Sequence, residues 1–360
     1  MGYAEDNPRT KQHLPDESLD ICEENLHLFF KTMFERQNVW YKRFILKKER
    51  PWTKDEFLRD YKFTNVYREL DRNSQYQIEN VFKSNIWSNS DRKELIWRIM
   101  LFRFFNQPEF FEFIEEFTHS AEMAGYEEYG FVGKIIPYNS FNPEHLKEFM
   151  EAYREKGGNP FTNAYLTNSQ ACPGKTRDEC FAFKVIPTLH ELVPKISKTL
   201  LLAKSPDDII KLLLTLPSVS HFMAHEFYQD FTYAPRYSGI DLMKFDQDDF
   251  TNVGPGAEVG IRLIFPSRKS KKEKLQAIYD LRDLAVDYLE QFGDFKYLEY
   301  NSISGNYFID YSKPKLTLHQ IEMWLCEFQK YWKMMIGEGK QRSIFQPKTK
   351  ISVSSKSKLK

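Results

Sequence analysis

The sequence predicts a mainly α protein that folds as a single large helical domain. Apolar residues recur every three or four positions through most of the 360 residues, which is the spacing of one helix face, and alternating strand-like runs are scarce. Helix-start signals such as Asn142-Pro143 and Ser205-Pro206 precede several of these stretches. A hydrophobic fraction of 41%, with 31 Phe and 20 Tyr, provides enough apolar surface for a large core.

Each helix is expected from its own start or stop signal. Asp91 and Glu94 form a capping-box pattern, and Thr317 and Gln320 form another. Gly157 marks the end of the helix that begins after Asn142. We therefore expect helices over residues 26–44, from 91, and over 142–157, 205–214, 274–292 and 317–337. Residues 157–185 are the least regular part, and either a surface excursion or a short strand pair fits them.

The ends of the chain differ in composition from its middle. Residues 1–20 are polar and are expected to be a flexible N-terminus, and residues 21–338 form the helical domain. Residues 340–360 contain seven Lys or Arg and no acidic residue, so 339–360 is expected to be a disordered basic tail. Three interpretations of this tail are compatible with its composition: a solvated chain end, a nucleic-acid contact and a nuclear-import signal.

Composition also limits the function. The 51 Lys and Arg balance the 51 Asp and Glu, so a polyanion partner would need a local patch. The four cysteines form no CxxC pair, which predicts reduced thiols and argues against a disulfide framework or a zinc site. No apolar run approaches a membrane span, so no membrane partner is expected. We expect an intracellular protein, nuclear if its source is eukaryotic.

Two short turns in the region 205–265 resemble the hairpin of helix-hairpin-helix proteins. One is Leu216 to Ser220, and the other is Gly254-Pro255-Gly256-Ala257. In such hairpins, small residues let the turn approach a phosphate, and the first amides of the next helix point at it. The second turn therefore predicts a DNA-phosphate contact through Gly254, Gly256 and Ala257. A plain loop is the alternative interpretation.

Acidic residues are concentrated between these two turns. A carboxylate there would be a general-base candidate, although solvated surface carboxylates are common. In hairpin-class DNA glycosylases a catalytic Asp follows the hairpin by about twenty residues, and Asp241 occupies that position. The residues in question are Asp230, Asp241, Asp246, Asp248 and Asp249.

A wider set of motifs resembles the alpha-glutamyl/putrescinyl thymine pyrophosphorylase superfamily. That superfamily shares its helical domain with phage 5-hydroxymethyldeoxyuridine DNA kinases. The resemblance spans about residues 26–333 and depends on the order of its motifs. They are residues 65–72 (NVYRELDR), Gln75-Tyr76, Phe222-Met223-Ala224 with Asp230 and Tyr233, Gly254 to Ala257 with Gly260-Ile261, and residues 325–328 (LCEF) with Lys330-Tyr331.

The resemblance implies an all-α domain, distantly similar to hairpin-containing DNA glycosylases, that acts on a hypermodified thymine in DNA. In the reaction proposed for the family, 5-hydroxymethyluracil carries a pyrophosphate, and an amine from an amino acid or polyamine displaces it. The implied partners are DNA with a flipped modified pyrimidine and a small amine; no protein partner is implied. A flipped base needs aromatic or apolar side chains to hold it.

The matching motifs supply candidates for each task in that reaction. The resemblance implies that a carboxylate accepts the proton of the amine, and Asp230 matches the family position, with Asp249 and Glu327 as further candidates. Positive charge would assist pyrophosphate departure. Structural pairing of an Arg with Asp71 or Glu69 is an alternative. Candidates for substrate and pyrophosphate binding are Asn65, Arg68, Asp71, Arg72, Tyr233 and Lys330.

Other chemistries find less support in the sequence. Gly174-Lys175-Thr176 lacks the first glycine of a P-loop, because Ser169 stands there, so no kinase activity is expected. His221 and His225 would share a helix face but have no third ligand, so neither a metal nor another cofactor is predicted. Two functional alternatives remain: a non-catalytic reader of modified pyrimidines and a glycosylase-like enzyme acting through Asp241.

Overall fold

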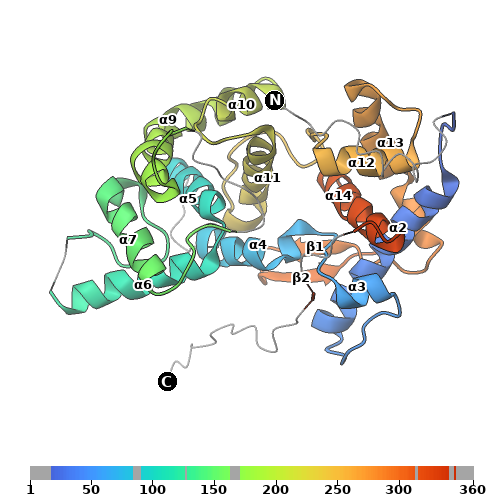
Figure 1. Cartoon of the computed structure of the whole chain (residues 1–360), viewed down its shortest axis with the longest axis horizontal. Coiled ribbons are helices and arrows are strands. Elements are labelled where there is room, and N and C mark those ends of the chain that lie inside the picture. The colour runs from blue at the N-terminus through green and yellow to red at the C-terminus, as the bar shows by residue number, and fades with distance from the viewer. Residues whose placement is uncertain are drawn as a thin grey trace.

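Helices dominate the fold, as the sequence predicts (Figure 1). The structure is a computed structural model, and it describes residues 18–83, 91–125, 128–162, 171–312, 315–339 and 344–345. The expected flexible segment 1–20 and basic tail 339–360 therefore lie mostly outside the described residues. No helix within the described ranges is long and apolar enough to cross a membrane.

The described helices run in chain order from α2 to α14. They are α2 (Glu23–Trp40), α3 (Glu56–Asp60), α4 (Arg72–Gln77), α5 (Arg92–Phe105), α6 (Pro108–Met123), α7 (Pro143–Glu155), α8 (Arg177–Cys180), α9 (Ile186–Leu202), α10 (Pro206–Leu213), α11 (His221–Ser238), α12 (Pro255–Ile264), α13 (Lys271–Glu290) and α14 (Leu318–Met335). Short 3₁₀ or π segments are η1 (Tyr41–Ile45), η2 (Arg68–Leu70), η3 (Ile78–Phe82), η5 (Tyr138–Ser140) and η6 (Phe181–Val185).

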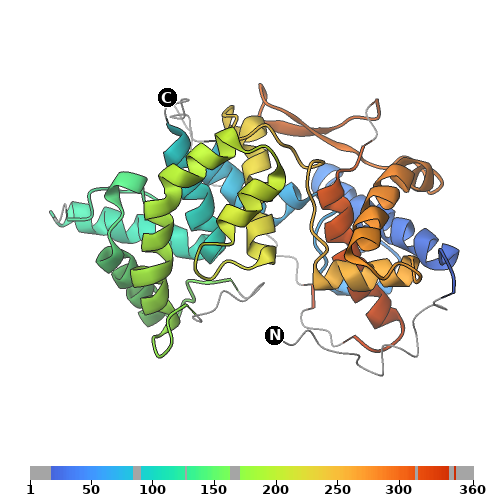
Figure 2. The same ribbon diagram turned by 90° about the horizontal axis from the view of Figure 1, so that it is seen from above.

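The described helices form two groups that lie side by side (Figure 2), and each group encloses a hydrophobic core. The middle core takes its buried side chains from residues 78–243, including most of α5, α9 and α11. The end core combines residues 26–67 with residues 257–332, so α2 packs against α12, α13 and α14. The chain therefore leaves the end core after Tyr67 and returns to it at Ala257.

Several helix starts match their sequence signals. The Asn142 side chain accepts a hydrogen bond from the Glu144 amide at 2.9 Å, and a capping box joins Thr317 to Gln320. The expectation for Asp91 was wrong, because its side chain caps nothing. Glu94 instead accepts a hydrogen bond from the Tyr138 amide at 2.8 Å, so a tertiary contact has taken the place of the local one.

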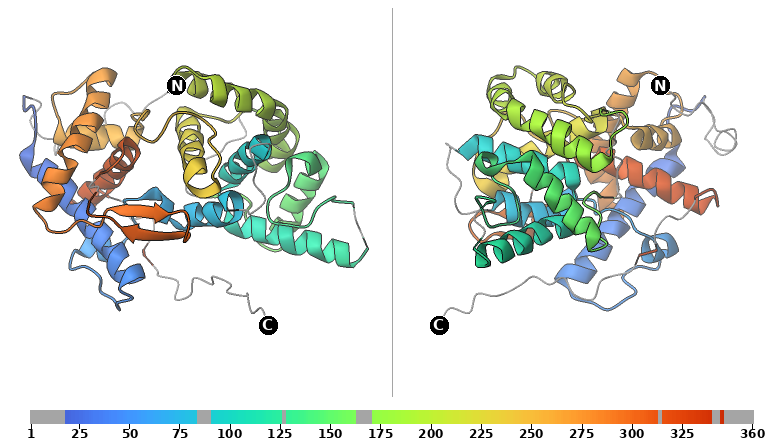
Figure 3. Two further views of the ribbon diagram at one scale, coloured as in Figure 1. Left: turned by 180° about the vertical axis from the view of Figure 1, so that it is seen from behind. Right: turned by 60° about the vertical axis from the view of Figure 1, so that its left-hand side comes forward.

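The only strands within the described residues form one antiparallel hairpin that the sequence did not predict. It pairs β1 (Leu298–Asn301) with β2 (Asn306–Ile309), and Leu298 lies opposite Ile309. Tyr300 and Tyr307 pack against the middle core, whereas Leu298 belongs to the end core. The hairpin therefore joins the two groups of helices, and the view from behind in Figure 3 shows it in front of them.

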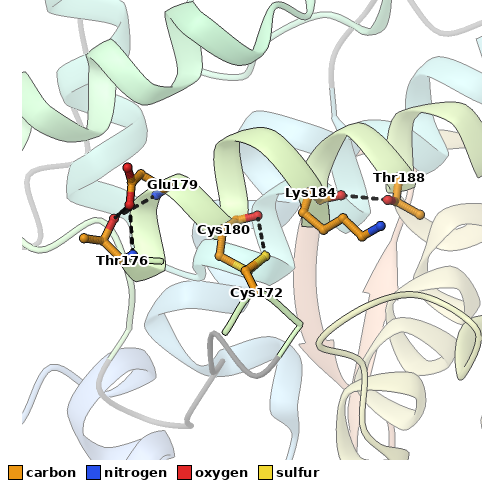
Figure 4. Close-up of a disulfide and its surroundings, with 6 residues drawn as sticks. All are labelled: Cys172, Thr176, Glu179, Cys180, Lys184 and Thr188. Atoms are coloured by element: carbon orange, nitrogen blue, oxygen red, sulfur yellow. Dashed lines mark hydrogen bonds between the residues drawn. A yellow bond between two sulfur atoms is a disulfide. The ribbon is translucent and has the colours of Figure 1, made fainter. Parts of the chain in front are cut away.

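The described part of the irregular segment 157–185 is helical rather than stranded, with α8 and η6 following a turn. Cys172 and Cys180 form a disulfide there, so the expectation of four reduced thiols was wrong for this pair (Figure 4). Their Cα atoms lie 5.6 Å apart because α8 begins between them. Cys22 and Cys326 are free.

Part of the expected disordered tail is ordered. Ile344 forms a β-bridge with Tyr61, and the Phe345 amide donates a hydrogen bond to the Asp60 carbonyl at 2.9 Å. The Phe345 ring also lies 6.3 Å from that of Trp52. The prediction of disorder was therefore wrong at these two residues, because backbone pairing and an aromatic contact hold them.

Candidate active site between the two cores

The first of the two predicted turns joins two helices and leads into the helix that carries the candidate acids. Helix α10 ends at Leu213, and α11 begins at His221 after a short turn. Ser218 adopts a φ of 62° in that turn, the left-handed conformation that favours glycine. Glu226 and Asp230 lie one turn apart on α11, so they share a helix face.

Asp230 is fully buried and bound to Arg103 of α5. Arg103 Nε donates to Asp230 Oδ2 at 2.7 Å, Nη2 of the same guanidinium bonds Oδ1, and Gln77 Nε2 donates to Oδ2 at 3.1 Å. Burial raises the pKa of Asp230, whereas Arg103 and Gln77 act to lower it. Because both carboxylate oxygens are occupied, Asp230 can fix the position of Arg103 but does not reach outward.

Arg103 connects this pair to a chain of charges that extends outward. Its Nη1 and Arg68 Nη2 each lie 3.2 Å from Glu226 Oε2, and Arg68 Nη1 lies 3.4 Å from Asp71 Oδ2. Burial acts to raise the pKa of Glu226, but the two guanidinium groups hold it at about 2. Glu226 is therefore an ionised carboxylate shared by two arginines, and the exposed fraction grows from Arg103 (2%) to Arg68 (20%).

The loop that carries Asn65 and Asp71 is fixed by its own hydrogen bonds. The backbone amide and the side-chain Nδ2 of Asn65 donate to Asp71 Oδ1 at 3.0 and 2.9 Å. Glu327 Oε2, on α14, accepts from the Thr64 amide at 3.1 Å and from Lys330 Nζ at 2.6 Å. This loop therefore links the arginine chain to α14 of the end core.

Two histidines and a glutamate complete the polar region between the cores. The His225 ring on α11 lies 5.6 Å from the His319 ring on α14, and neither His319 nitrogen has a hydrogen-bond partner within the described residues. Burial lowers the pKa of His225 to about 4 and that of His319 to about 3. Burial, together with the charge of Glu226, raises the pKa of Glu322 to about 8.

We call this region the polar seam. It joins side chains from α4, α5, α11 and α14 with the loop before α4. The described residues contain no group of three or more His, Cys, Asp or Glu arranged to hold a metal ion. The members of the polar seam are Asn65, Arg68, Asp71, Gln77, Arg103, His225, Glu226, Asp230, His319, Glu322 and Glu327.

Five of the twelve site residues predicted from the sequence meet in the polar seam, namely Asn65, Arg68, Asp71, Asp230 and Glu327. Lys330 lies at its edge beside Glu327, and Tyr233 is buried with a hydroxyl that has no partner among the described residues. Arg72 lies elsewhere, in an ion pair with Glu109 at the surface. Asp249 is exposed in a loop, where its Oδ2 accepts from the Asp246 amide at 2.8 Å.

The second predicted hairpin is wrong, because residues 240–254 contain no helix. The side chains of Asp246 and Asp249 instead accept hydrogen bonds from the nearby amides of Asp248 and Asp246, which compete with helix formation. The Asp248 side chain accepts from the distant Leu318 amide, at the start of α14, at 3.1 Å. Gly254 is therefore only the residue at which α12 begins.

The glycines of this turn lie against α14. A Cβ on Gly256 would meet Cys326 Sγ at 2.9 Å, and one on Gly260 would meet the Leu325 carbonyl oxygen at 2.6 Å. The amides of Gly254 and Ala257 face the side chains of Glu322 and Cys326. This corrects the phosphate interpretation of Gly254, Gly256 and Ala257, because the small residues let two helices approach and the amides face inward.

Sequence reasoning missed six members of the polar seam: Gln77, Arg103, His225, Glu226, His319 and Glu322. Arg103 interrupts the apolar run Leu101 to Phe105, and a lone charge in such a run indicates a buried partner. Glu226 lies four residues before Asp230, on the same helix face. His319 and Glu322 share a face of α14 in the same way, but no local pattern shows that they meet α11.

The comparisons with known proteins agree on the helical domain. A 5-hmdU DNA kinase of Bacillus phage SP10 is 28% identical over 313 residues, which are 85% of this chain and 44% of the phage protein. The chain thus spans less than half the length of that relative. No solved structure matches, so the likeness to hairpin glycosylases stays a prediction. The family described as "5-hmdU DNA kinase, helical domain" matches residues 23–341, and the chain belongs to this family.

Proposed function

We propose that this chain takes part in modifying 5-hydroxymethyluracil in DNA. Two findings support the proposal: the family match over residues 23–341, and the phage relative, which is named for 5-hmdU in DNA. An enzymatic role is supported by one observation, the chain of charged side chains that runs from Asp71 through Arg68, Glu226 and Arg103 to Asp230. Such a network is costly to bury and orients its members closely, as a site for reacting groups requires.

The reaction that we propose is transfer of an amine to a pyrophosphorylated 5-hydroxymethyluracil. The amine nitrogen attacks the exocyclic methylene carbon, a C–N bond forms, and the C–O bond to pyrophosphate breaks. Pyrophosphate leaves with that oxygen and with the electron pair of the broken bond. The nitrogen loses one proton, which a carboxylate accepts.

The charges of the polar seam suit an amine co-substrate. Five carboxyl groups (Asp71, Glu226, Asp230, Glu322 and Glu327) lie with three cations (Arg68, Arg103 and Lys330) in or beside the polar seam. Arg36 of α2, outside the seam, is close enough to interact with the charges of Asp71 and Glu327. Glu322 is the carboxyl without an ion pair in the described structure, and its pKa is raised to about 8. At pH 7 the free group is mostly protonated, and it accepts a proton only when it is ionised, which a pH above 8 or the charge of a nearby ammonium favours. We therefore assign Glu322 as the group that meets the ammonium and accepts the proton.

The other candidate acids take different roles in this proposal. Asp230 positions Arg103, and through it Glu226, because both of its oxygens are occupied. Glu327 holds the loop at Thr64. Asp249 contacts no member of the polar seam, so the proposal gives it no catalytic role. Arg68 is the most exposed arginine of the chain of charges and is our candidate to contact the pyrophosphate.

Kinase activity, which the name of the phage relative suggests, finds no support in the described Gly174-Lys175-Thr176 segment. The Thr176 amide and hydroxyl each lie 2.9 Å from Glu179 Oε2, so a carboxylate occupies the donors that a phosphate would use (Figure 4). The helix that follows is only four residues long. A P-loop needs free amides at the start of a full helix.

Nucleoside mass spectrometry tests the proposal. DNA that carries pyrophosphorylated 5-hydroxymethyluracil is incubated with the protein and with amino acids or polyamines. A base with the mass of the amine adduct supports the transferase. Abasic sites would instead favour a glycosylase acting through Asp241, and binding without any change would favour a reader.

A matched pair of variants tests the proton acceptor. Glu322→Gln removes the base but keeps the size, and we expect turnover to fall by about 10²-fold or more. Asp249→Asn makes the same chemical change on the exposed loop and should leave turnover within about twofold. Equal effects of the two substitutions would contradict the assignment of Glu322.

A further inference from the structure

A basic segment follows α2 on the surface of the end core. Residues 42–54 contain Lys42, Arg43, Lys47, Lys48, Arg50 and Lys54, with Glu49 as the only acidic residue before Asp55. None of these six cations forms an ion pair within the described structure. Because the whole chain has no net charge, this segment is a local concentration of positive charge.

Two of the arginines share the same aromatic rings. The Arg43 guanidinium lies 5.2 Å from the centre of the Trp52 ring and 5.3 Å from that of Phe345, and Arg50 lies 5.7 and 5.6 Å from the same rings. Burial lowers the pKa of Arg43, and the charge of Arg50 lowers it further. Like charges are thus held near one another without an ion pair of their own. One carboxylate, that of Asp60, interacts with Arg50, but it is already paired with Arg59. Such an arrangement favours a bound anion.

The backbone of the segment fixes this arrangement. Lys42 Nζ donates to the Trp52 carbonyl at 2.8 Å, and the Trp52 indole donates to the Lys48 carbonyl at 2.7 Å. Phe345 arrives from the other end of the chain through its hydrogen bond to Asp60. Arg50 Nη2 also donates to the Arg59 carbonyl at 2.8 Å. Because these contacts already order Arg50 and the two rings, less side-chain entropy is lost when they bind a ligand.

Two further features extend the surface. Ile45 and Leu46 are 46% and 43% exposed beside Lys47, so apolar side chains stand among the cations. Phe345 adds a second aromatic ring to this surface beside Trp52. Cations interspersed with aromatic and apolar side chains are typical of surfaces that grip nucleic-acid backbones and stack on sugars and bases.

We propose that residues 42–54 and Phe345 form a docking surface for the phosphate backbone of DNA, separate from the polar seam. The choice of DNA over another polyanion rests on the proposed function, whereas the anion site itself rests on the unpaired cations. Such contacts hold the backbone without reading the sequence, so this surface would position the strand while the polar seam takes the modified base.

The salt dependence of DNA binding by the full chain tests the docking surface. We expect Lys47→Ala/Lys48→Ala to reduce the slope of log K against log salt concentration by about 2, since each phosphate contact contributes about 0.9. Affinity at low salt should fall by about tenfold or more. Both lysines are exposed, so the variant should fold, and circular dichroism checks this.

The control is Lys195→Ala/Lys198→Ala, an exposed lysine pair on α9 of the middle core, which should leave the slope unchanged. Equal slopes for wild type and Lys47→Ala/Lys48→Ala would overturn the docking surface while leaving the proposed function intact. Failure of the wild-type chain to bind DNA would overturn both. Loss of binding to phosphatidylserine vesicles, with DNA binding unchanged, would overturn the docking surface in favour of a lipid partner.

Discussion

Arg103 and Asp230 form a buried ion pair in which Nε donates to Oδ2 at 2.7 Å and Nη2 bonds the second oxygen. The two side chains are 2% and 0% exposed and come from α5 and α11. The pair fixes the relative position of two helices of the middle core and sets the direction in which Arg103 approaches Glu226. Its effects on stability and on function are therefore coupled.

Replacing Asp230 by Ala should lower the free energy of unfolding by about 3–5 kcal/mol, because the charge of Arg103 would stay buried with less compensation. Urea denaturation measures this change. The double variant Arg103→Met/Asp230→Leu removes both charges and should recover most of the lost stability. If the double variant were as unstable as Asp230→Ala, the packing at this site would matter more than the charge.

Gly260→Ala should destabilise the protein by about 2 kcal/mol or more, because its Cβ would lie 2.6 Å from the Leu325 carbonyl oxygen on α14. Gly254→Ala is the matched control, since that Cβ meets only the Glu322 side chain at 3.3 Å. Thermal unfolding should separate the two variants clearly. Comparable melting temperatures would show that α12 and α14 can move apart.

Ser218→Gly should raise the free energy of unfolding by up to about 1 kcal/mol. Ser218 has a φ of 62°, which costs an L residue about 1–2 kcal/mol, and glycine recovers this at a smaller entropic cost. The measurement is a denaturation midpoint for the single substitution. A loss of stability would show that side-chain contacts of Ser218 outweigh the backbone strain.

The buried histidines should make stability depend on pH. His225 and His319 have folded pKa values of about 4 and 3, below the ordinary 6.5, so the unfolded chain binds more protons between these limits. The free energy of unfolding should be highest above pH 6.5 and should fall as the pH drops from 6.5 towards 4, by about 1.4 kcal/mol per pH unit for each histidine.

Denaturation of His319→Gln across the same pH range tests this expectation. The free energy of unfolding of the variant should depend less steeply on pH, because only His225 would still contribute to the slope. An unchanged slope would mean that His319 is not shielded from water when the protein is folded.

The helices were predictable because their signals are local. Thr317 and Gln320 form the expected capping box, and Asn142 caps α7 as its sequence indicates. The division into two cores was not predictable, because it depends on contacts between residues such as Arg68 and Glu226, which are 158 positions apart. Periodicity tells which face of a helix is apolar, but it does not tell which helix covers that face.

The site was predictable only in part for the same reason. The resemblance pointed to Asn65, Arg68, Asp71, Asp230 and Glu327, and the structure brings these residues together. The resemblance did not point to Arg103. The signal for that residue was its position as a lone charge in an apolar run. A glycine at position 256 is compatible with a phosphate contact and also with the close packing of two helices. Only the position of α14 distinguishes these two interpretations.

The make-up of the end core has a consequence for synthesis on the ribosome. Phe29 and Phe30 of α2 pack against residues of α13 and α14, which are translated more than two hundred residues later. The fully buried side chains of the middle core all come from residues 78–243, so most of this core can assemble while the ribosome is still working. Helix α2 thus waits for α13 and α14, and its apolar face stays uncovered while the residues between them are translated.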